Sequence, residues 1–321
     1  MNIHKLVVDA YSRIKPHIRE TPLEYSAYLS SLCNCEVYLK LENQQITGSF
    51  KARGGLNKIL SLSDEDRNKG VITASTGNHA AAIGFALDIA GTYGEIYMPE
   101  NVAELKIQNL KQYKNVKITL FGKDSVDAEA EALKQSELQN MVYVSPYNDE
   151  EVIGGQGTVA YEILKKLPDV ENVLVPVGGG GLISGIAGYF AAEKPNVEVI
   201  GCQPVNSAVM FHSVNAGEIL DMESKPTVSD GTAGGIEQGS ITFPICQQHV
   251  SEYHLVEENE IIDGLGILLK HHQIMAEGAA GLSVASLIKN KAKYEGKKVV
   301  LILCGNKMSI ELMKTVIKHL E

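Results

Sequence analysis

The chain has 321 residues, about twice the length of a typical single domain, so two lobes or one large α/β unit are expected. A hydrophobic content of 44%, a charged content of 21% and a mean hydropathy of −0.04 exclude a disordered or membrane-embedded protein. Twenty-nine basic and 39 acidic residues give a net charge of −10, with no basic cluster. Nucleic acid is therefore a poor partner, and a small molecule is the better expectation.

The amino terminus and the cysteines indicate the compartment. Residues 1–15, MNIHKLVVDAYSRIK, carry charges throughout and match neither a signal peptide nor a membrane span, so we expect a cytoplasmic protein. The five cysteines show no C-x-x-C spacing, which argues against disulfides or a zinc module. Cys33 and Cys35 are interpreted as packing residues, with metal binding as the alternative. No metal site is expected, since three histidines lack partners at ligand spacing: His212, His271 and His272.

Strand-length apolar runs alternate with longer helical patterns. Strands are predicted at 36–42, 70–75, 94–100, 116–122 and 141–146, and helices at 51–62, 78–90, 103–113 and 125–139. A second series of strands follows at 172–177, 197–204, 251–257 and 297–304. Such alternation is typical of parallel sheets joined by crossover helices. We therefore predict a two-lobed α/β protein, each lobe a mostly parallel sheet covered by helices, with a small lobe of 43–147 and a large lobe of 1–42 and 148–321.

The first segment with chemical potential is TGSFKARGG, residues 47–55. Lys51 stands at the start of a helical pattern, where the positive end of the helix dipole favours its neutral amine. A neutral amine is a nucleophile. The alternative is an ordinary exposed lysine, which the uncharged neighbours ITGSF disfavour.

The second segment is TASTGNHAAA, residues 73–82, which leads from a strand through a polar turn into a helix. Ser75, Thr76, Gly77 and Asn78 offer hydroxyls, an amide and backbone N–H groups that suit a carboxylate. Plain helix capping is an equally good interpretation.

The third segment is VPVGGGGLISG, residues 175–185. Four consecutive glycines before a helix leave backbone N–H groups unshielded, which predicts phosphate binding, with a flexible turn as the alternative. A dinucleotide is disfavoured because the G-x-G-x-x-G spacing is absent and the next strand ends in Gln203 instead of an acidic residue. A P-loop is excluded because no lysine and Ser/Thr pair comes after the glycines.

A long irregular stretch spans residues 218–240, EILDMESKPTVSDGTAGGIEQGS, and long ordered loops in enzymes are often functional. In and just after it, Glu237, Ser240 and Thr242 are candidates for contact with a substrate side chain, or for an ordinary surface loop.

Three features together specify a pyridoxal-phosphate enzyme that acts on amino acids: a glycine loop that can bind a phosphate, a turn that can bind a carboxylate, and a lysine whose amine is neutral. The sequence resembles the serine/threonine dehydratase and serine racemase family of fold-type II, tryptophan-synthase-β-like enzymes. The resemblance rests on ordered motifs across nearly the whole chain: IRETPLEYS, YLKLENQQITGSFKARGGLN, STGNHAAAIGFA, GGGGL, EGAAGLSVA and LCGN. It implies pyridoxal 5'-phosphate bound mainly by the large lobe, an amino acid substrate and a homodimer.

The resemblance also implies individual roles. Lys51 is expected to form the internal aldimine and to remove the α-proton, Phe50 to pack beside the pyridine ring, and Asn78 to bond its 3-hydroxyl. The phosphate loop is expected to be Gly178, Gly179, Gly180 and Gly181, and the substrate turn Ser75, Thr76, Gly77 and His79. Glu277 is expected near the cofactor, with a helix-surface charge as the alternative.

Cys304 bears on the reaction type. In the family this residue faces the pyridine nitrogen, and a neutral thiol there weakens the full electron sink and favours loss of a β-leaving group. We therefore expect β-elimination of a β-hydroxy amino acid such as L-threonine or L-serine to a 2-keto acid and ammonia, with the proton for the leaving hydroxyl supplied through the cofactor phosphate.

Three alternatives stay open. Thr76 places a hydroxyl where racemases carry a catalytic serine, so a serine or other amino acid racemase is the second interpretation, and a hydroxyaspartate dehydratase is the third. A non-catalytic pyridoxal-phosphate-binding protein is disfavoured because Lys51 and Asn78 are intact. The divalent-cation site of racemase-like members is expected to be absent or altered, since Gln203 and Val209 stand at its acidic positions. The motif CGN is one glycine shorter than the usual GGN after residue 304.

Overall fold

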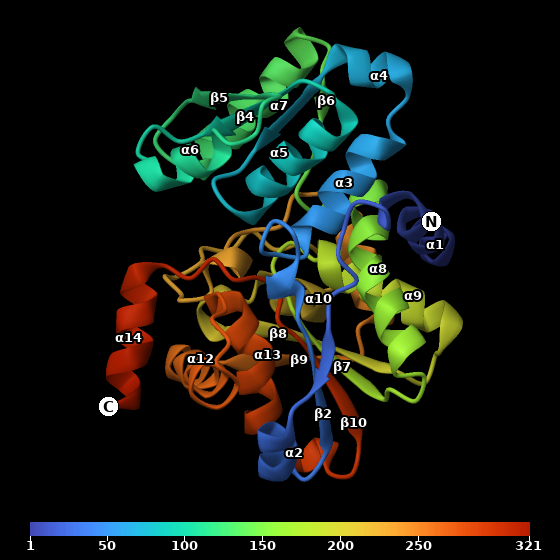
Figure 1. The fold of residues 1–321 in the computed structure, drawn as a ribbon, viewed down its shortest axis with the longest axis vertical. Coiled ribbons are helices and arrows are strands. Elements are labelled where there is room, and N and C mark those ends of the chain that lie inside the picture. The colour runs from blue at the N-terminus through green and yellow to red at the C-terminus, as the bar shows by residue number, and fades with distance from the viewer.

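Two β-sheets of unequal size organise the chain, which the computed structural model describes over residues 1–321. The small lobe stands above the large lobe, with α3 and α8 at the level where they meet (Figure 1). The strands are β1 (Leu23–Tyr25), β2 (Glu36–Lys40), β3 (Val71–Ala74), β4 (Gly94–Met98), β5 (Val116–Leu120), β6 (Val142–Tyr143), β7 (Asn172–Pro176), β8 (Glu198–Pro204), β9 (Glu252–Val256) and β10 (Lys298–Ile302).

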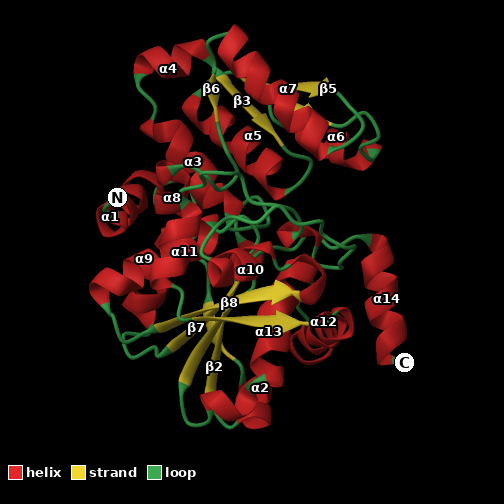
Figure 2. Ribbon diagram, turned by 180° about the vertical axis from the view of Figure 1, so that it is seen from behind, coloured by secondary structure: helices red, strands yellow, loops and turns green.

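Fourteen α-helices surround these sheets (Figure 2). They are α1 (Ile3–Ile14), α2 (Ala27–Cys33), α3 (Lys51–Ser61), α4 (Asp64–Lys69), α5 (Asn78–Ala90), α6 (Glu104–Leu110), α7 (Ser125–Leu138), α8 (Glu150–Lys166), α9 (Gly181–Glu193), α10 (Val209–Ala216), α11 (Thr242–His249), α12 (Glu258–His272), α13 (Gly278–Lys289) and α14 (Ile310–Leu320). No helix combines the length and the apolar character needed to cross a membrane.

The large lobe contains a six-stranded sheet in the order β1-β2-β10-β7-β8-β9. Only β1 runs antiparallel to its neighbour; the other four pairings are parallel. Its central strands are apolar on both faces because α8 and α9 cover one side and α12 and α13 the other (Figure 1). These strands and helices contribute to a core of 53 buried hydrophobic residues, which is the main core of the molecule.

The small lobe contains four parallel strands in the order β5-β4-β3-β6. The two mostly parallel sheets with their helices confirm the predicted two-lobed α/β fold. The small sheet lies within residues 71–143, inside the predicted range 43–147, whose exact limits stay a prediction. The strand predicted at 141–146 is a strand only over Val142–Tyr143, and just beyond it the carbonyl oxygen of Val144 accepts from the hydroxyl of Thr73 instead of from a backbone N–H.

Glycines allow the helices between the lobes to pack closely. A Cβ on Gly155 of α8 would lie 2.6 Å from the carbonyl oxygen of Arg53 in α3, and one on Gly55 of α3 would lie 3.2 Å from the Cβ of Ala82 in α5. Helix α3 is therefore held between α8 of the large lobe and α5 of the small lobe. This contact places the amino end of α3, and with it Lys51, at the junction of the two lobes.

Candidate active site

A cavity of about 280 Å³ lies between the lobes and is lined by 22 residues. The walls come from the loops that follow β3, β7 and β10 at their carboxyl ends and from the amino ends of α3, α5 and α9. Ligands of open parallel sheets bind at this edge. The cavity is therefore the candidate active site, and the three sequence segments singled out for their chemistry all reach it.

Lys51 projects into this cavity from the first position of α3. Its Nζ donates a hydrogen bond to the carbonyl oxygen of Pro146 over 2.7 Å and lies 5.3 Å from the centre of the Phe50 ring. Burial lowers the pKa of Lys51 from its ordinary 10.5 to about 8, although the charge of Glu277 acts in the opposite direction. A substantial fraction of the amine is thus neutral near physiological pH, for which burial gives a stronger reason than the helix dipole.

The four glycines form a cradle between β7 and α9. Gly178, Gly179, Gly180 and Gly181 all line the cavity, and Gly180 has a φ of +89°, which favours glycine. A Cβ on Gly179 would lie 2.5 Å from the Tyr147 ring. The cradle is open to an anion at the first turn of a helix, where the free backbone N–H groups concentrate positive charge.

The cradle has a polar support behind it. Thr242 donates its hydroxyl to the carbonyl oxygen of Gly179 over 2.7 Å, and the Ser240 hydroxyl lies 2.8 Å from the Thr242 hydroxyl. Both side chains are buried. Of the three residues offered as substrate contacts, these two instead hold the loop, while Glu237 is exposed and accepts from Asn148 over 2.7 Å.

The polar turn after β3 divides between two cavities. Ser75, Gly77, Asn78 and His79 line the candidate site, whereas Thr76 lines only a neighbouring cavity of about 70 Å³, which Ser75 and Glu129 also line. The proposed roles of Thr76 in catalysis and substrate binding thus lack a direct place in the main cavity. They stay predictions.

His79 contributes little polarity to the cavity from its ring. Its Nε2 lies 3.1 Å from the hydroxyl of Thr73 and 3.2 Å from the carbonyl oxygen of Val144, both in the small lobe. Burial, with the nearby charge of Lys51, lowers the pKa of His79 to about 3, so the ring is neutral. A carboxylate at this turn would meet the backbone N–H of residue 79 at the start of α5.

Glu277 links two further polar groups of the cavity. Asn78 donates from Nδ2 to Oε2 of Glu277 over 2.8 Å, and the Cys304 thiol donates to Oε1 over 3.4 Å. Glu277 is only 4% exposed, which rules out the alternative interpretation as a helix-surface charge. Burial raises the pKa of Glu277 and, more strongly, that of Cys304, so residue 304 is a neutral thiol.

Other lining residues escaped sequence reasoning. Pro146 and Tyr147 come after β6, and Gly231, Thr232 and Ala233 belong to the irregular stretch 218–240. Length and composition alone indicate a functional role for that stretch, without singling out any of these three residues. The signal for Pro146 and Tyr147 is their position at the carboxyl end of a predicted strand, the edge at which ligands of parallel sheets bind.

The residues present fit pyridoxal phosphate. A buried Oδ1 of Asn78 has no hydrogen-bond partner and can accept a bond from a ring hydroxyl. The glycine cradle suits a phosphate, the neutral fraction of Lys51 suits an aldehyde, and Cys304 offers an uncharged neighbour to a ring nitrogen. Across the chain, no three histidine, cysteine or acidic side chains are grouped to hold a metal ion. Gln203, at an acidic position of the racemase cation site, bonds instead to the backbone of Val177 and Phe211.

Comparisons with known proteins agree with this fit. The chain matches the family described as "Pyridoxal-phosphate dependent enzyme" over residues 14–305. It is 40% identical over 311 residues to an L-threonine ammonia-lyase of Thermotoga maritima, covering 97% of this chain and 77% of that protein. The processed form of threonine deaminase isoform 2 from Solanum lycopersicum superimposes with a TM-score of 0.93 at 30% identity, covering 99% and 93% of the two chains. Maize serine racemase superimposes with a TM-score of 0.91 at 29% identity, covering 99% and 97%.

Proposed function

Because the chain belongs to the family of pyridoxal-phosphate dependent enzymes, we propose that it is an ammonia-lyase that converts a small β-hydroxy amino acid, L-threonine or L-serine, to a 2-keto acid and ammonia. The observation that carries this proposal is the Lys51 amine, with a pKa of about 8, in the same cavity as the four-glycine cradle. The 40% identical L-threonine ammonia-lyase supports the same reaction.

Different residues of this chain would bind different parts of the cofactor. Gly178, Gly179, Gly180 and Gly181 would bind its phosphate through backbone N–H groups, and Lys51 would bind its carbonyl carbon. Phe50 would pack beside the ring, and Asn78 would meet the ring hydroxyl. When bound, pyridoxal phosphate supplies an electron sink that acidifies the α-proton of an attached amino acid.

The chemistry then requires a base, and Lys51 is suited to it. An amine with a pKa of about 8 can take the α-proton at Nζ and hold it near neutral pH. The Cα–H and Cβ–O bonds of the substrate break, and the departing hydroxyl takes up one proton, equal to the one removed from Cα, and leaves as water. One water molecule then hydrolyses the released enamine to the 2-keto acid and ammonia. Cys304 stays neutral and gives its hydrogen bond to Glu277, so it places no compensating negative charge beside the ring nitrogen. This environment favours elimination over transamination.

The lining of the cavity limits the substrate's side chain. Lys51 is the only lysine or arginine among the 22 lining residues, and the ring of His79 is neutral. A second carboxylate, as in 3-hydroxyaspartate, would be buried beside Glu277 without a cationic partner, which is costly. Small neutral side chains avoid this cost. The cavity therefore supports L-threonine and L-serine over hydroxyaspartate.

Racemisation is the second candidate, because a hydroxyl does reach the cavity. Ser75 lines it, and its Oγ accepts from the N–H of Gly77 over 3.2 Å, so it stands near the turn proposed for the substrate carboxylate. Racemisation needs a second acid or base opposite Lys51. Thr76, the residue expected for that role, lines the neighbouring cavity, which favours elimination.

The test is product analysis with the purified protein loaded with pyridoxal phosphate. L-threonine, L-serine, their D-enantiomers and 3-hydroxyaspartate are supplied separately, and keto acid, ammonia and the opposite enantiomer are measured in each sample. Keto acid and ammonia in equal amounts from L-threonine or L-serine are the expected result. Accumulation of the opposite enantiomer without ammonia would establish the racemase instead, and keto acid from 3-hydroxyaspartate alone would contradict the substrate argument.

The proposal includes a cytoplasmic homodimer. The five free, buried cysteines are compatible with a reducing compartment. The homodimer rests on the family resemblance. Light scattering coupled to size exclusion, which would give about twice the 34.8 kDa chain mass, tests the assembly.

A further inference from the structure

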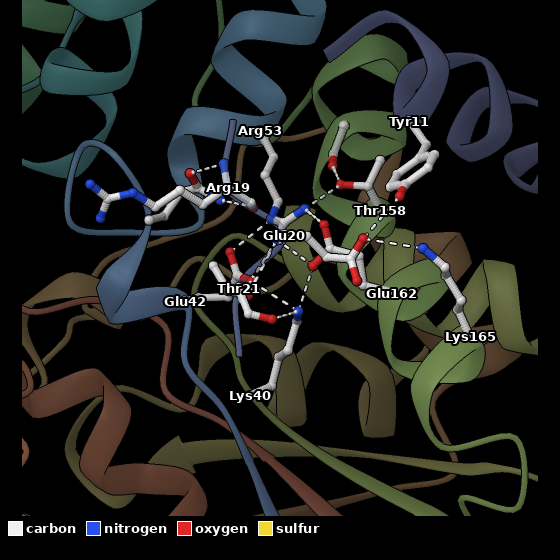
Figure 3. A network of polar contacts seen from close by, with 12 residues as sticks. Tyr11, Arg19, Glu20, Thr21, Lys40, Glu42, Arg53, Thr158, Glu162 and Lys165 are labelled. Atoms are coloured by element: carbon white, nitrogen blue, oxygen red, sulfur yellow. Dashed lines mark hydrogen bonds and ion pairs between the residues drawn. The ribbon is translucent and has the colours of Figure 1, made fainter. Parts of the chain in front are cut away.

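A second cluster of charged residues lies next to the active site without lining it (Figure 3). Lys40, Glu42, Arg53 and Glu162 each have 0% exposed area. Three of them come from the end of β2, the short turn after it and α3, and Glu162 comes from α8, 109 residues after Arg53. The cluster therefore joins the strand that leads to Lys51, the helix that carries it and the long helix of the large lobe.

Arg53 stands at the centre of this cluster. Its guanidinium donates to both carboxylate oxygens of Glu42, over 2.7 and 2.8 Å, and to both of Glu162, over 2.7 and 2.8 Å. A further bond of 3.1 Å reaches the hydroxyl of Thr158. Two forked pairs on one planar group fix its plane and its position in a way that a single ion pair cannot.

The rest of the cluster keeps the charges balanced. Lys40 donates to Glu162 over 2.5 Å and to the carbonyl oxygen of Thr21 over 2.9 Å, so two cations face two carboxylates. Apolar residues of similar volume often replace buried ion pairs without loss of stability. Stability alone is thus a weak account of this arrangement, whereas fixed geometry accounts for it directly.

The sequence of α3 makes Arg53 the residue able to fix its first turn. Between Lys51 and Leu56 stand Ala52, Arg53, Gly54 and Gly55, so only Arg53 has a side chain longer than a methyl group. Residues two positions apart in an α-helix point about 200° apart. Arg53 therefore faces the large-lobe core while Lys51 faces the cavity, and any rotation of the turn displaces the Lys51 amine.

We propose that Arg53 is a positioning residue for Lys51, and that its forked bonds to Glu42 and Glu162 set the rotation of the first turn of α3 that aims the amine into the cavity. This inference rests on the proposed function, in which Lys51 is the reactive amine. Arg53 itself touches neither substrate nor cofactor. A displaced amine would react more slowly both with pyridoxal phosphate and with the α-proton.

The test variant is Arg53→Lys, which keeps the positive charge but loses both forks. Folding is checked by circular dichroism and thermal melting. Two rates are then measured: covalent attachment of pyridoxal phosphate to the apoprotein, followed by visible absorbance, and turnover of L-threonine. We expect attachment and kcat to fall by about a hundredfold, as a small misplacement of a reacting group can cause, with KM changed less than about threefold.

The matched control is Thr158→Val, which keeps a side chain of similar volume. It removes one hydrogen bond of Arg53 in the same cluster but leaves both forks, to Glu42 and to Glu162, in place. We expect attachment and kcat within about threefold of wild type. A control as impaired as Arg53→Lys would overturn the proposal, because general damage to the cluster would then explain both.

The remaining outcomes are also decisive. A folded Arg53→Lys protein with wild-type attachment and kcat overturns the proposal. If that variant does not fold, the charge-neutral double variant Arg53→Met with Glu162→Gln is measured in the same way, and failure of both to fold assigns the cluster a purely structural role, which also overturns it. If the wild type releases no keto acid, the proposed function fails, yet the attachment rate still decides the role of Arg53 because it needs no substrate.

Discussion

The buried cluster around Arg53 and the cavity around Lys51 lie on opposite sides of one helical turn. The pKa of the cation is raised in the cluster and lowered in the cavity. At Arg53 burial lowers the pKa, but Glu42 and Glu162 outweigh it and raise the pKa above its ordinary value. At Lys51 the nearest hydrogen-bond partner is a backbone carbonyl, so burial prevails and the pKa falls to about 8. Burial acts on both cations; the two forked carboxylates outweigh it at Arg53, whereas Lys51 has no carboxylate in hydrogen-bond contact.

The difference shows how one segment serves two purposes. Charges that are fully paired at short distance define a shape, because each partner restricts the other. A charge left without a carboxylate partner keeps its chemical reactivity, as a perturbed pKa at an active site indicates. In α3 these two conditions are two residues apart, and substitutions on either side of the turn test them separately.

The largest effect is expected from Lys51→Ala. Without the amine there is no group to bind the cofactor covalently or to take the α-proton, so visible cofactor absorbance should disappear and turnover should fall by at least about a thousandfold. Absorbance titration with pyridoxal phosphate and keto-acid release measure the two effects. Lys58→Ala, on the same helix and paired with Asp149 away from the cavity, is the control and should keep both. Turnover that survives Lys51→Ala would end the assignment of this residue.

A smaller effect, measured as the stability of the fold, is expected from Glu42→Ala. It leaves Lys40 and Arg53 buried with a single carboxylate, and breaking a buried pair in this way costs about 3–5 kcal/mol. Urea unfolding followed by circular dichroism gives the change in the free energy of unfolding. The exposed Glu218→Ala should change it by less than about 0.5 kcal/mol. Equal stability of the two variants would show that the cluster does not contribute as paired charges.

The sequence predicts the residues of the cavity around Lys51 better than the buried ion pairs around Arg53. Lys51, Asn78 and the four glycines stand in short motifs whose chemistry is local, so their convergence followed from strands that end at the same edge. Arg53 stood in the same motif, but its partner Glu162 lies 109 residues away in a helix with no local signal of an ion pair. Long-range pairing of buried charges is set by packing, which one sequence does not display.

The direction in which a side chain points is the second feature that the sequence does not predict. Thr76 and Ser75 are adjacent polar residues in one turn, and nothing in their local sequence separates them. In the fold Ser75 lines both the main cavity and the smaller one, whereas Thr76 lines only the smaller one, beside Glu129. Likewise His79 has the character of a polar site residue, yet its ring bonds to Thr73 inside the small lobe. Backbone dihedrals within a turn, which depend on its packing, decide these directions.

The role of the four-glycine cradle in the cavity is tested by Gly179→Ala. The added Cβ would stand 2.5 Å from the Tyr147 ring and within the cradle, and overpacking of this kind costs about 1–3 kcal/mol. We expect pyridoxal phosphate to bind about 10- to 100-fold more weakly, measured by absorbance titration. Gly235→Ala is the matched control, since this glycine also lines the cavity but an added Cβ meets nothing within 4 Å. Equal weakening by both changes would remove the special role of the cradle.

The smallest effect concerns pH and arises from the lowered pKa of Lys51. The neutral amine attacks the cofactor's carbonyl carbon, and its fraction rises as pH passes upward through about 8. Attachment of pyridoxal phosphate to the apoprotein should therefore accelerate about tenfold between pH 7 and pH 9 and then level off. A solvated lysine would instead keep accelerating to about pH 10.4.

Glu277→Gln refines this pH experiment, because the charge of Glu277 raises the pKa of Lys51 against the effect of burial. Removing that charge should move the midpoint of the attachment rate to lower pH, while the amide at residue 277 keeps one of the two acceptor oxygens that Asn78 and Cys304 use. A midpoint that stays in place would show that the charge of Glu277 has no effect on the pKa of Lys51. A midpoint that moves to higher pH would contradict the electrostatic account, since removing a negative neighbour cannot favour the ammonium form.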